Sequence, residues 1–181
     1  VNDGDNFNLN YSGRANDLNF YFSHSDKNLD NFDIPDEAVI HEPGETHEEK
    51  SFLENSDSKM AATRIGISKT GDWGYYGISS VIIDQINGVP FHGEEEEAPA
   101  PGQPEPEHER IFAVTDSSML NIEGEYFLSG SINSINYFFR ETDSTLTEQH
   151  EEEEGGHVGE EEGATTFTNN SEEAQIILDV S

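Results

Sequence analysis

Six of the seven histidines in this chain occur as pairs inside glutamate-rich stretches. The pairs are His41 and His47, His92 and His108, and His150 and His157, whereas His24 stands apart. Imidazole nitrogens beside carboxylates form the ligand set that Zn²⁺, Cu²⁺ and Ni²⁺ prefer in proteins. Because three separate segments share this composition and the rest of the chain lacks it, the sequence predicts divalent transition-metal binding, with Zn²⁺ as the first candidate.

Glutamates next to these histidines are predicted to complete the metal coordination. A structural zinc site needs about four ligands, which two histidines and two carboxylates from one or two loops could supply. The spacing matches no standard zinc signature, so the prediction rests on composition. The predicted carboxylate ligands are Glu48, Glu107, Glu109 and Glu151. A run of glutamates is also typical of a tract that is merely solvated and disordered, and this alternative stays open.

A second cation-binding pattern begins at Asp26 and resembles a calcium loop. Oxygen-bearing side chains occupy positions 1, 3, 5 and 12 of the EF-hand loop pattern, at Asp26, Asn28, Asp30 and Glu37. The segment departs from that pattern at Asn31, where glycine is usual, and its flanks have the alternation of strands rather than helices. The sequence therefore predicts either a Ca²⁺ site or an ordinary Asx-rich turn.

The chain carries no catalytic motif. Ser23, His24 and Asp26 have the side-chain types of a nucleophile, a base and an acid, but adjacency in sequence is not triad geometry, and no oxyanion-hole glycine motif follows. His24 is predicted to be a surface or turn residue. The aromatic segment 72–77 could stack against a sugar, although packing in the core or at the rim of a sheet is the preferred interpretation. We expect a protein that is not an enzyme.

The negative net charge limits the classes of molecule that the chain can bind. The 181 residues carry a formal net charge of −31, which repels nucleic acid and anionic lipid and attracts metal ions, basic proteins and cationic surfaces. No apolar stretch approaches the roughly 20 residues that span a bilayer as a helix. The chain contains no cysteine, so disulfides and thiolate metal sites are excluded. The first residue is Val1, which suits a mature exported chain, so we expect a secreted, periplasmic or cell-surface protein.

The segments outside the acidic tracts are predicted to be antiparallel strands. Apolar residues alternate strictly at Phe7 to Tyr11, Leu18 to Phe22 and Ala174 to Val180, which is the pattern of half-buried strands. The first two are expected to pair as a hairpin through a loop at 13–16. Asn87 and Gly88 are expected to form a type I′ turn. Ile132 and Ile135 cannot share one face of a regular strand, so a bulge is expected near residues 133–134.

No amphipathic helix of three turns is recognisable, and short strands punctuated by Gly, Asn and Ser favour an all-β fold, an antiparallel β-sandwich or jelly-roll. We expect one domain over residues 1–181, with long acidic loop insertions at about 41–55, 92–109 and 141–163. Loops of this length are usually functional or disordered.

Two classes of function follow. The first is an exported protein that binds zinc through its Glu/His-rich loops, for buffering, delivery or ordering of those loops. The second is an extracellular structural protein, a filament subunit or adhesin module, in which acidic loops bind Ca²⁺ or solvate the surface. Copies of the chain could pair through the terminal strands in the second case. A basic protein is a third and weaker partner, which would include a role as a nucleic-acid mimic.

Overall fold

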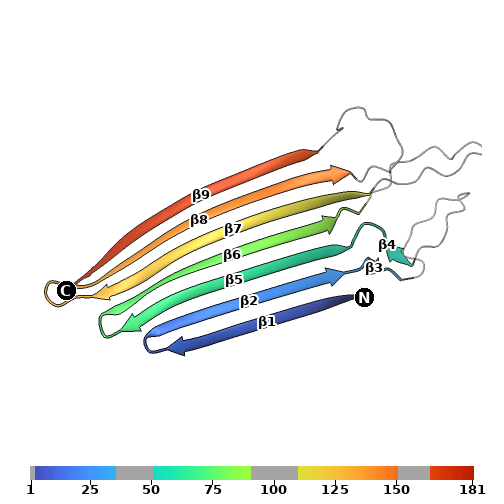
Figure 1. Cartoon of the computed structure of the whole chain (residues 1–181). Coiled ribbons are helices and arrows are strands. Elements are labelled where there is room, and N and C mark those ends of the chain that lie inside the picture. The colour runs from blue at the N-terminus through green and yellow to red at the C-terminus, as the bar shows by residue number, and fades with distance from the viewer. Residues whose placement is uncertain (1–2, 36–50, 91–109, 151–163) are drawn as a thin grey trace, which may run out of the picture.

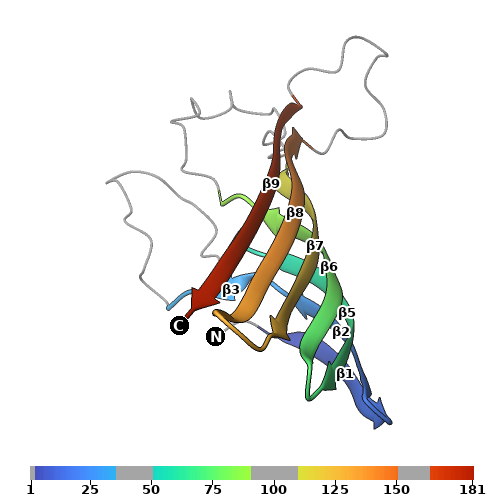
Figure 2. The same ribbon diagram turned by 90° about the vertical axis from the view of Figure 1, so that its left-hand side faces the viewer.

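A computed structural model describes residues 3–35, 51–90, 110–150 and 164–181, and these residues form antiparallel β-structure without a helix. Figure 1 shows the strands side by side in one layer, and Figure 2 shows the layer from its end. The nine strands are β1 (Gly4–Ala15), β2 (Leu18–Leu29), β3 (Phe32–Asp33), β4 (Phe52–Leu53), β5 (Ser58–Gly71), β6 (Gly74–Gly88), β7 (Ile111–Phe127), β8 (Ile132–His150) and β9 (Thr165–Val180).

Seven long strands make up the main sheet. Their spatial order is β1-β2-β5-β6-β7-β8-β9, so strands that follow one another in sequence are also neighbours in space. Strands β3 and β4 form a separate two-stranded ribbon. The predicted all-β, antiparallel class is confirmed. The strands are longer than expected, from 12 residues in β1 to 19 in β8, because polar stretches that resembled loops continue the strands.

The predicted N-terminal hairpin and the predicted bulge are both present. Strand β1 pairs with β2 from Gly4 opposite Leu29 to Ala15 opposite Leu18. Asn16 occupies the turn with a φ of 56°, in the left-handed region that asparagine tolerates better than most residues. In the pairing of β8 with β9, the register shifts between Ile132 and Ser134. The loss of alternation in the sequence therefore located a real irregularity.

Two predictions about loops are wrong. Asn87 and Gly88 form no type I′ turn; they continue β6 and pair with β7, opposite Ala113 and Phe112. The third insert does not begin at residue 141, because β8 continues to His150. Residues 142–147 include three threonines, whose branched side chains favour strands, and they pair with β7 on one side and β9 on the other.

The two faces of the main sheet differ in polarity. One row of cross-strand partners crosses all seven strands without a polar side chain: Gly13, Phe20, Ile67, Ile78, Ile122, Phe139 and Ala174. We call this side of the sheet the apolar face. The neighbouring row points to the opposite, polar face: Ser12, Tyr21, Gly66, Ser79, Asn121, Arg140 and Glu173.

Neither face is covered by a second layer of described residues. Ala62 is the one buried apolar residue among them, and no large side chain in that part of the chain is fully buried. The sandwich or jelly-roll that the sequence predicted requires a second sheet packed about 10 Å away. The ribbon of β3 and β4 has two residues in each strand and is too small to supply it.

Candidate functional site at the insert end of the sheet

The two ends of the main sheet are connected in different ways. At one end, which we call the turn end, short connections join β1 to β2, β5 to β6 and β7 to β8. At the other end, the insert end, β3 is joined to β4, β6 to β7 and β8 to β9 by chain segments that include the three Glu/His-rich inserts. In Figure 1 the strand ends that flank these segments all lie at the same end of the sheet. We call the residues that flank each insert its neck.

The neck of the first insert is held by a buried serine. The Ser56 hydroxyl donates to the Leu53 carbonyl oxygen at 2.6 Å and accepts the Phe32 amide N–H at 2.8 Å. The Ser56 amide N–H donates to the Asn31 side-chain oxygen at 2.9 Å, and Ser56 is only 7% exposed. These bonds join the chain that enters the β3–β4 ribbon to the chain that leaves it. Ile34 and Ser51 extend the ribbon by one further backbone hydrogen bond of 2.9 Å.

The first neck is bonded directly to the second. The Gly88 amide N–H donates to the Asp57 carbonyl oxygen at 2.9 Å, and the Asp57 carboxylate forms an ion pair with the Arg110 guanidinium. Both side chains of the ion pair are partly exposed. The Arg110 guanidinium also lies 5.5 Å from the centre of the Phe112 ring. Residues on both sides of the second insert, Gly88 before it and Arg110 after it, thus contact Asp57.

The third neck lies beside the second in the sheet. His150 ends β8 opposite Ile111, the first residue of β7, and Glu148 pairs with Thr165 at the start of β9. The three necks therefore form a continuous line across the insert end, from β2 to β9. His150 is the one paired histidine whose backbone belongs to the described residues.

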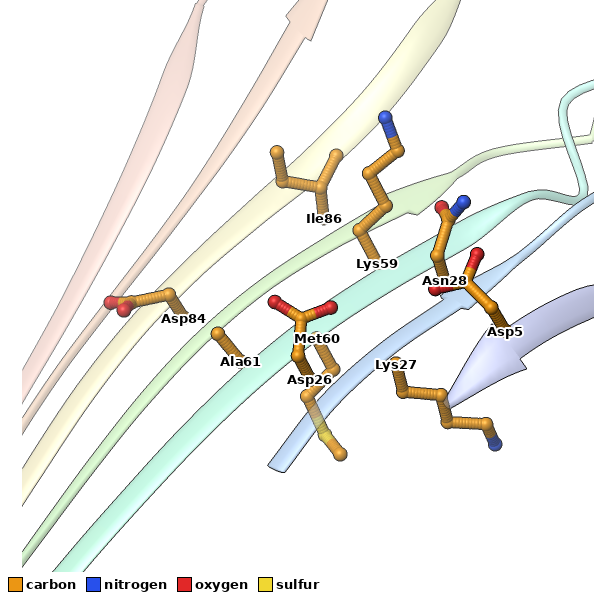
Figure 3. Close-up of a pocket in the computed structure, with 9 residues that line it drawn as sticks. All are labelled: Asp5, Asp26, Lys27, Asn28, Lys59, Met60, Ala61, Asp84 and Ile86. Atoms are coloured by element: carbon orange, nitrogen blue, oxygen red, sulfur yellow. The ribbon is translucent and has the colours of Figure 1, made fainter. Parts of the chain in front are cut away.

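An open pocket of about 410 Å³ lies next to the first two necks. Its lining combines oxygen-bearing side chains with two lysines and comprises Asp5, Asp26, Lys27, Asn28, Lys59, Met60, Ala61, Asp84 and Ile86. Figure 3 shows the carboxylates of Asp26 and Asp84 on either side of Ala61. Asp84 also pairs with Asp116 on β7, which places two like charges directly opposite each other, an unfavourable arrangement in a sheet. The insert end of the sheet thus brings several carboxylates close together, with Lys27 and Lys59 among them.

The residues of the predicted calcium loop lie in and just after a regular strand. Asp26 and Asn28 belong to β2, where they pair with Ala61 and Lys59, and Asp30 follows the end of that strand. An extended strand separates every second residue by more than 6 Å, so these two side chains lie side by side along the pocket and do not surround a common centre. Glu37 lies outside the described residues.

The predicted transition-metal ligands fall almost entirely outside the described part of the chain. His150 is described only as the last residue of β8. The others lie in segments that the structure does not describe: His41, His47, His92, His108, His157, Glu48, Glu107, Glu109 and Glu151. Within the described ranges, no group of three or more His, Asp or Glu side chains could hold a metal ion.

His24 and residues of the aromatic segment 72–77 contact neighbouring side chains of the main sheet. His24 lies within β2, not in a turn, and its Nδ1 atom is 3.0 Å from the Thr63 hydroxyl on β5. Trp73 lies in the turn between β5 and β6, with ring centres 5.6 Å from Tyr76 and 6.1 Å from Tyr126. The aromatic segment therefore packs at the rim of the sheet.

Sequence reasoning missed the residues that join the necks, Ser56, Asp57 and Arg110. One signal was present for Arg110, because it is one of only eight basic residues and directly follows an acidic insert. A lone cation beside an acidic tract indicates an ion pair, but its partner is 53 positions away in the sequence. No local pattern distinguishes Asp57 from the other aspartates of this acidic chain.

No helix that is long and apolar enough to cross a membrane occurs among the residues that the structure describes. The chain matches no family model, and neither a curated protein nor a solved structure is detectably similar to it.

Proposed function

We propose that this protein binds divalent transition metal, with Zn²⁺ as the preferred ion, through the three Glu/His-rich inserts at the insert end of the sheet. The ligands are drawn from the six paired histidines and the neighbouring glutamates. The observation that carries the proposal is the line of necks, in which Asp57 contacts Gly88 and Arg110, and Ile111 pairs with His150.

The spacing of the necks allows the inserts to meet. Six adjacent strands, from β2 to β9, cover five strand spacings, which is about 24 Å at about 4.8 Å each. An extended chain reaches about 3.3 Å per residue, so the middle of the shortest segment, residues 151–163, can extend about 20 Å from its ends. Histidines from neighbouring inserts can therefore reach one ion without any change in the sheet.

Electrostatics supports a role for a cation at this end. Like charges 4 Å apart repel by about 1 kcal/mol in water and about 4 kcal/mol at an effective dielectric constant of 20. The described sheet already carries Asp26, Asp84 and Asp116 near the insert end. Converging inserts would add many more carboxylates to that charge. A bound divalent ion would offset the repulsion, whereas inserts without an ion would be driven apart.

Isothermal titration calorimetry tests the proposal. Replacing all six paired histidines by alanine should weaken Zn²⁺ binding by at least a hundredfold, because neutral imidazole is the preferred nitrogen ligand. His24→Ala is the matched control, since this histidine lies within β2 and contacts Thr63. The control should bind Zn²⁺ as the natural sequence does. Unchanged Zn²⁺ affinity in the sixfold variant would refute the proposal.

A second candidate is an extracellular structural module that binds Ca²⁺ or pairs with copies of itself. The outer edges of β1 and β9 have no strand partner among the described residues, and all 16 residues of β9 are exposed. An unpaired edge offers a row of N–H and C=O groups to another strand. Both candidates are compatible with a secreted, periplasmic or cell-surface location.

The two candidates differ in their response to Ca²⁺. Asp26→Asn combined with Asp84→Asn removes two carboxylates from the pocket while preserving the shapes of the side chains. If the pocket binds Ca²⁺, this variant should lose Ca²⁺ binding and keep Zn²⁺ binding. A natural protein that binds Ca²⁺ and ignores Zn²⁺ would favour the structural module over the zinc protein.

A further inference from the structure

The apolar face carries a band of exposed and half-buried apolar side chains, which we call the apolar band. Its members are the apolar side chains that point to this face at 7–11 on β1, 18–22 on β2, 65–67 on β5, 78–82 on β6, 120–122 on β7, 135–139 on β8 and 174–180 on β9. We propose that this band contacts the acyl chains of uncharged or zwitterionic lipid. This inference is independent of metal binding, because it concerns one face of the sheet and not the inserts.

The exposure of these side chains requires a partner. Ile65 is 52% exposed, Ile78 44% and Ile176 73%, and they are members of one band rather than scattered residues. Soluble monomers rarely leave a contiguous apolar patch of this extent in water, and such patches usually mark a contact with protein or membrane. Burial of apolar surface is favourable by roughly 25 cal/mol per Å², so covering the band is a strong driving force.

The borders of the band match the layers of a lipid leaflet. Towards the turn end it is bordered by the rings of Trp73, Tyr76 and Tyr126, and the Trp73 ring contacts both tyrosine rings. Tryptophan and tyrosine concentrate where hydrocarbon meets headgroups, because their rings are apolar with one polar atom. Towards the insert end the same face carries the carboxylates of Asp84 and Asp116, which belong in water. On β6 and β7, carboxylates, apolar side chains and aromatic rings thus follow one another from the insert end to the turn end.

The band also runs obliquely across the sheet. On β1 it is centred on Leu9, whose row of partners ends at Asn170 on β9. On β9 the members of the band run from Ala174 to Val180, so their midpoint is at position 177, about seven residues further towards the turn end. Seven residues at about 3.3 Å over six strand spacings of about 4.8 Å correspond to a strand tilt of about 40°. A flat apolar layer crossed by tilted strands produces such a drift.

The thickness of the band fits the same partner. Three to seven residues on each strand, at about 3.3 Å per residue and a tilt of about 40°, give a band about 8–18 Å deep. The hydrocarbon of one leaflet is about 15 Å, half of a core of about 30 Å. An unpaired strand edge is costly in hydrocarbon, so lipid contact is expected together with pairing of the outer edges of β1 and β9 to further strands.

Charge argues against two competing occupants. A second copy packed on the apolar face would bring two chains of formal charge −31 together. It would also place the aspartates of one copy near those of the other, with Lys59 and Lys69 as the basic residues of this face within the described ranges. An anionic lipid surface would be repelled in the same way. Zwitterionic lipid has no net charge, so it would cover the band without this repulsion.

Trp73 is the only tryptophan in the chain and reports directly on this contact. The full chain would be mixed with phosphatidylcholine vesicles, and its fluorescence recorded with ordinary lipid and with lipid brominated on the acyl chains. We expect a blue shift of the emission, quenching by the brominated lipid, and flotation of the protein with the vesicles. Vesicles rich in phosphatidylglycerol should bind less protein at low salt.

A matched pair of variants assigns the contact to one face. Ile78→Glu with Ile176→Glu places two charges in the apolar band, whereas Val81→Glu with Ile177→Glu places the same charges on the same strands but on the polar face. Ile176 and Ile177 are adjacent and both exposed. The first variant should lose at least tenfold in vesicle binding and the second should change less than twofold.

Three outcomes would overturn the proposal. One is the absence of both quenching and flotation for the natural sequence, a result that depends on no variant. Another is equal loss of binding in the two variants, which would indicate unspecific adsorption. The third is a stable dimer in light scattering that only the Ile78→Glu, Ile176→Glu variant dissociates, because the occupant of the band would then be a second copy. Circular dichroism of both variants checks that they keep the sheet.

Discussion

The turn end and the insert end of the main sheet differ in how they connect the same seven strands. At the turn end, short connections and packed aromatic rings fix how one strand follows the next, as Trp73 does with Tyr76 and Tyr126. At the insert end, long acidic segments leave the sheet, and polar contacts of Ser56 and Asp57 join the first two necks. The turn end thus connects neighbouring strands directly, whereas the insert end is where we propose that metal binds.

The largest effect on stability is expected at the turn end, from Gly74→Ala. Gly74 has a φ of 128°, and a Cβ atom there would lie 1.9 Å from the Glu125 carbonyl oxygen. A side chain is strained at this φ, and the backbone of β7 would have to move. We expect a loss of about 3 kcal/mol, or a fall in melting temperature of about 6–12 °C.

Gly66→Ala is the control for this effect, because its new Cβ would meet Ser79 at an ordinary 3.4 Å. Its melting temperature should stay within about 2 °C of the natural protein, since a Gly to Ala change without strain is neutral or slightly stabilising. Equal losses in the two variants would contradict the view that the Gly74 turn has a special role in the architecture.

At the insert end the largest change in stability should come from Zn²⁺ binding. Binding only to the folded form stabilises it by RT ln(1 + [L]/Kd), about 2.7 kcal/mol at a hundredfold excess over Kd. Imidazole must be neutral to coordinate, and an unperturbed imidazole titrates near pH 6.5. The rise in melting temperature with Zn²⁺ should therefore be large at pH 7.5 and small at pH 5.5.

Stabilisation by Ca²⁺ should depend on pH differently from stabilisation by Zn²⁺. Oxygen ligands do not compete with protons over this pH range, so stabilisation by Ca²⁺ should be similar at both pH values. Melting curves with each ion at each pH therefore separate the two candidate functions. A response to Ca²⁺ alone that does not depend on pH would reverse the order in which we place them.

A smaller loss is expected from Ser56→Ala in the first neck. The substitution leaves the Phe32 amide N–H and the Leu53 carbonyl oxygen without the hydroxyl that bonds both. Leaving a buried polar group without its partner costs about 1–3 kcal/mol. We expect about 1.5 kcal/mol by chemical denaturation, together with weaker Zn²⁺ binding. Ser51→Ala, at an exposed neighbouring position, should have neither effect.

The smallest effect is expected from the ion pair that joins the first two necks. Both side chains are partly exposed, and pairs of this kind contribute about 0.2–1 kcal/mol. A double-mutant cycle with Asp57→Asn and Arg110→Gln should give a coupling energy of about 0.5 kcal/mol that decreases with salt. A coupling energy of zero at low salt would show that the necks are aligned by the backbone alone.

Alternation in the sequence was sufficient to predict an all-β antiparallel fold, the first hairpin and the irregularity near Asn133 and Ser134. These features are local, because side chains alternate between two faces with a period of two residues. The sequence also identified the Glu/His-rich segments by composition. It did not predict that β8 continues to His150, because a strand with polar residues on both faces lacks the apolar period that marks a strand.

Only the tertiary structure decided how distant segments meet. Strand order and register bring the three necks to one end of the sheet, and Asp57 reaches Arg110 across 53 positions of sequence. Register likewise decided that Phe20, Ile78 and Phe139 share one row on one face. Backbone pairing selects such partners one strand at a time, so no local pattern of residues contains this information. The sequence supplied the Glu/His-rich inserts and the apolar residues, and the sheet decided which necks and which apolar side chains lie together.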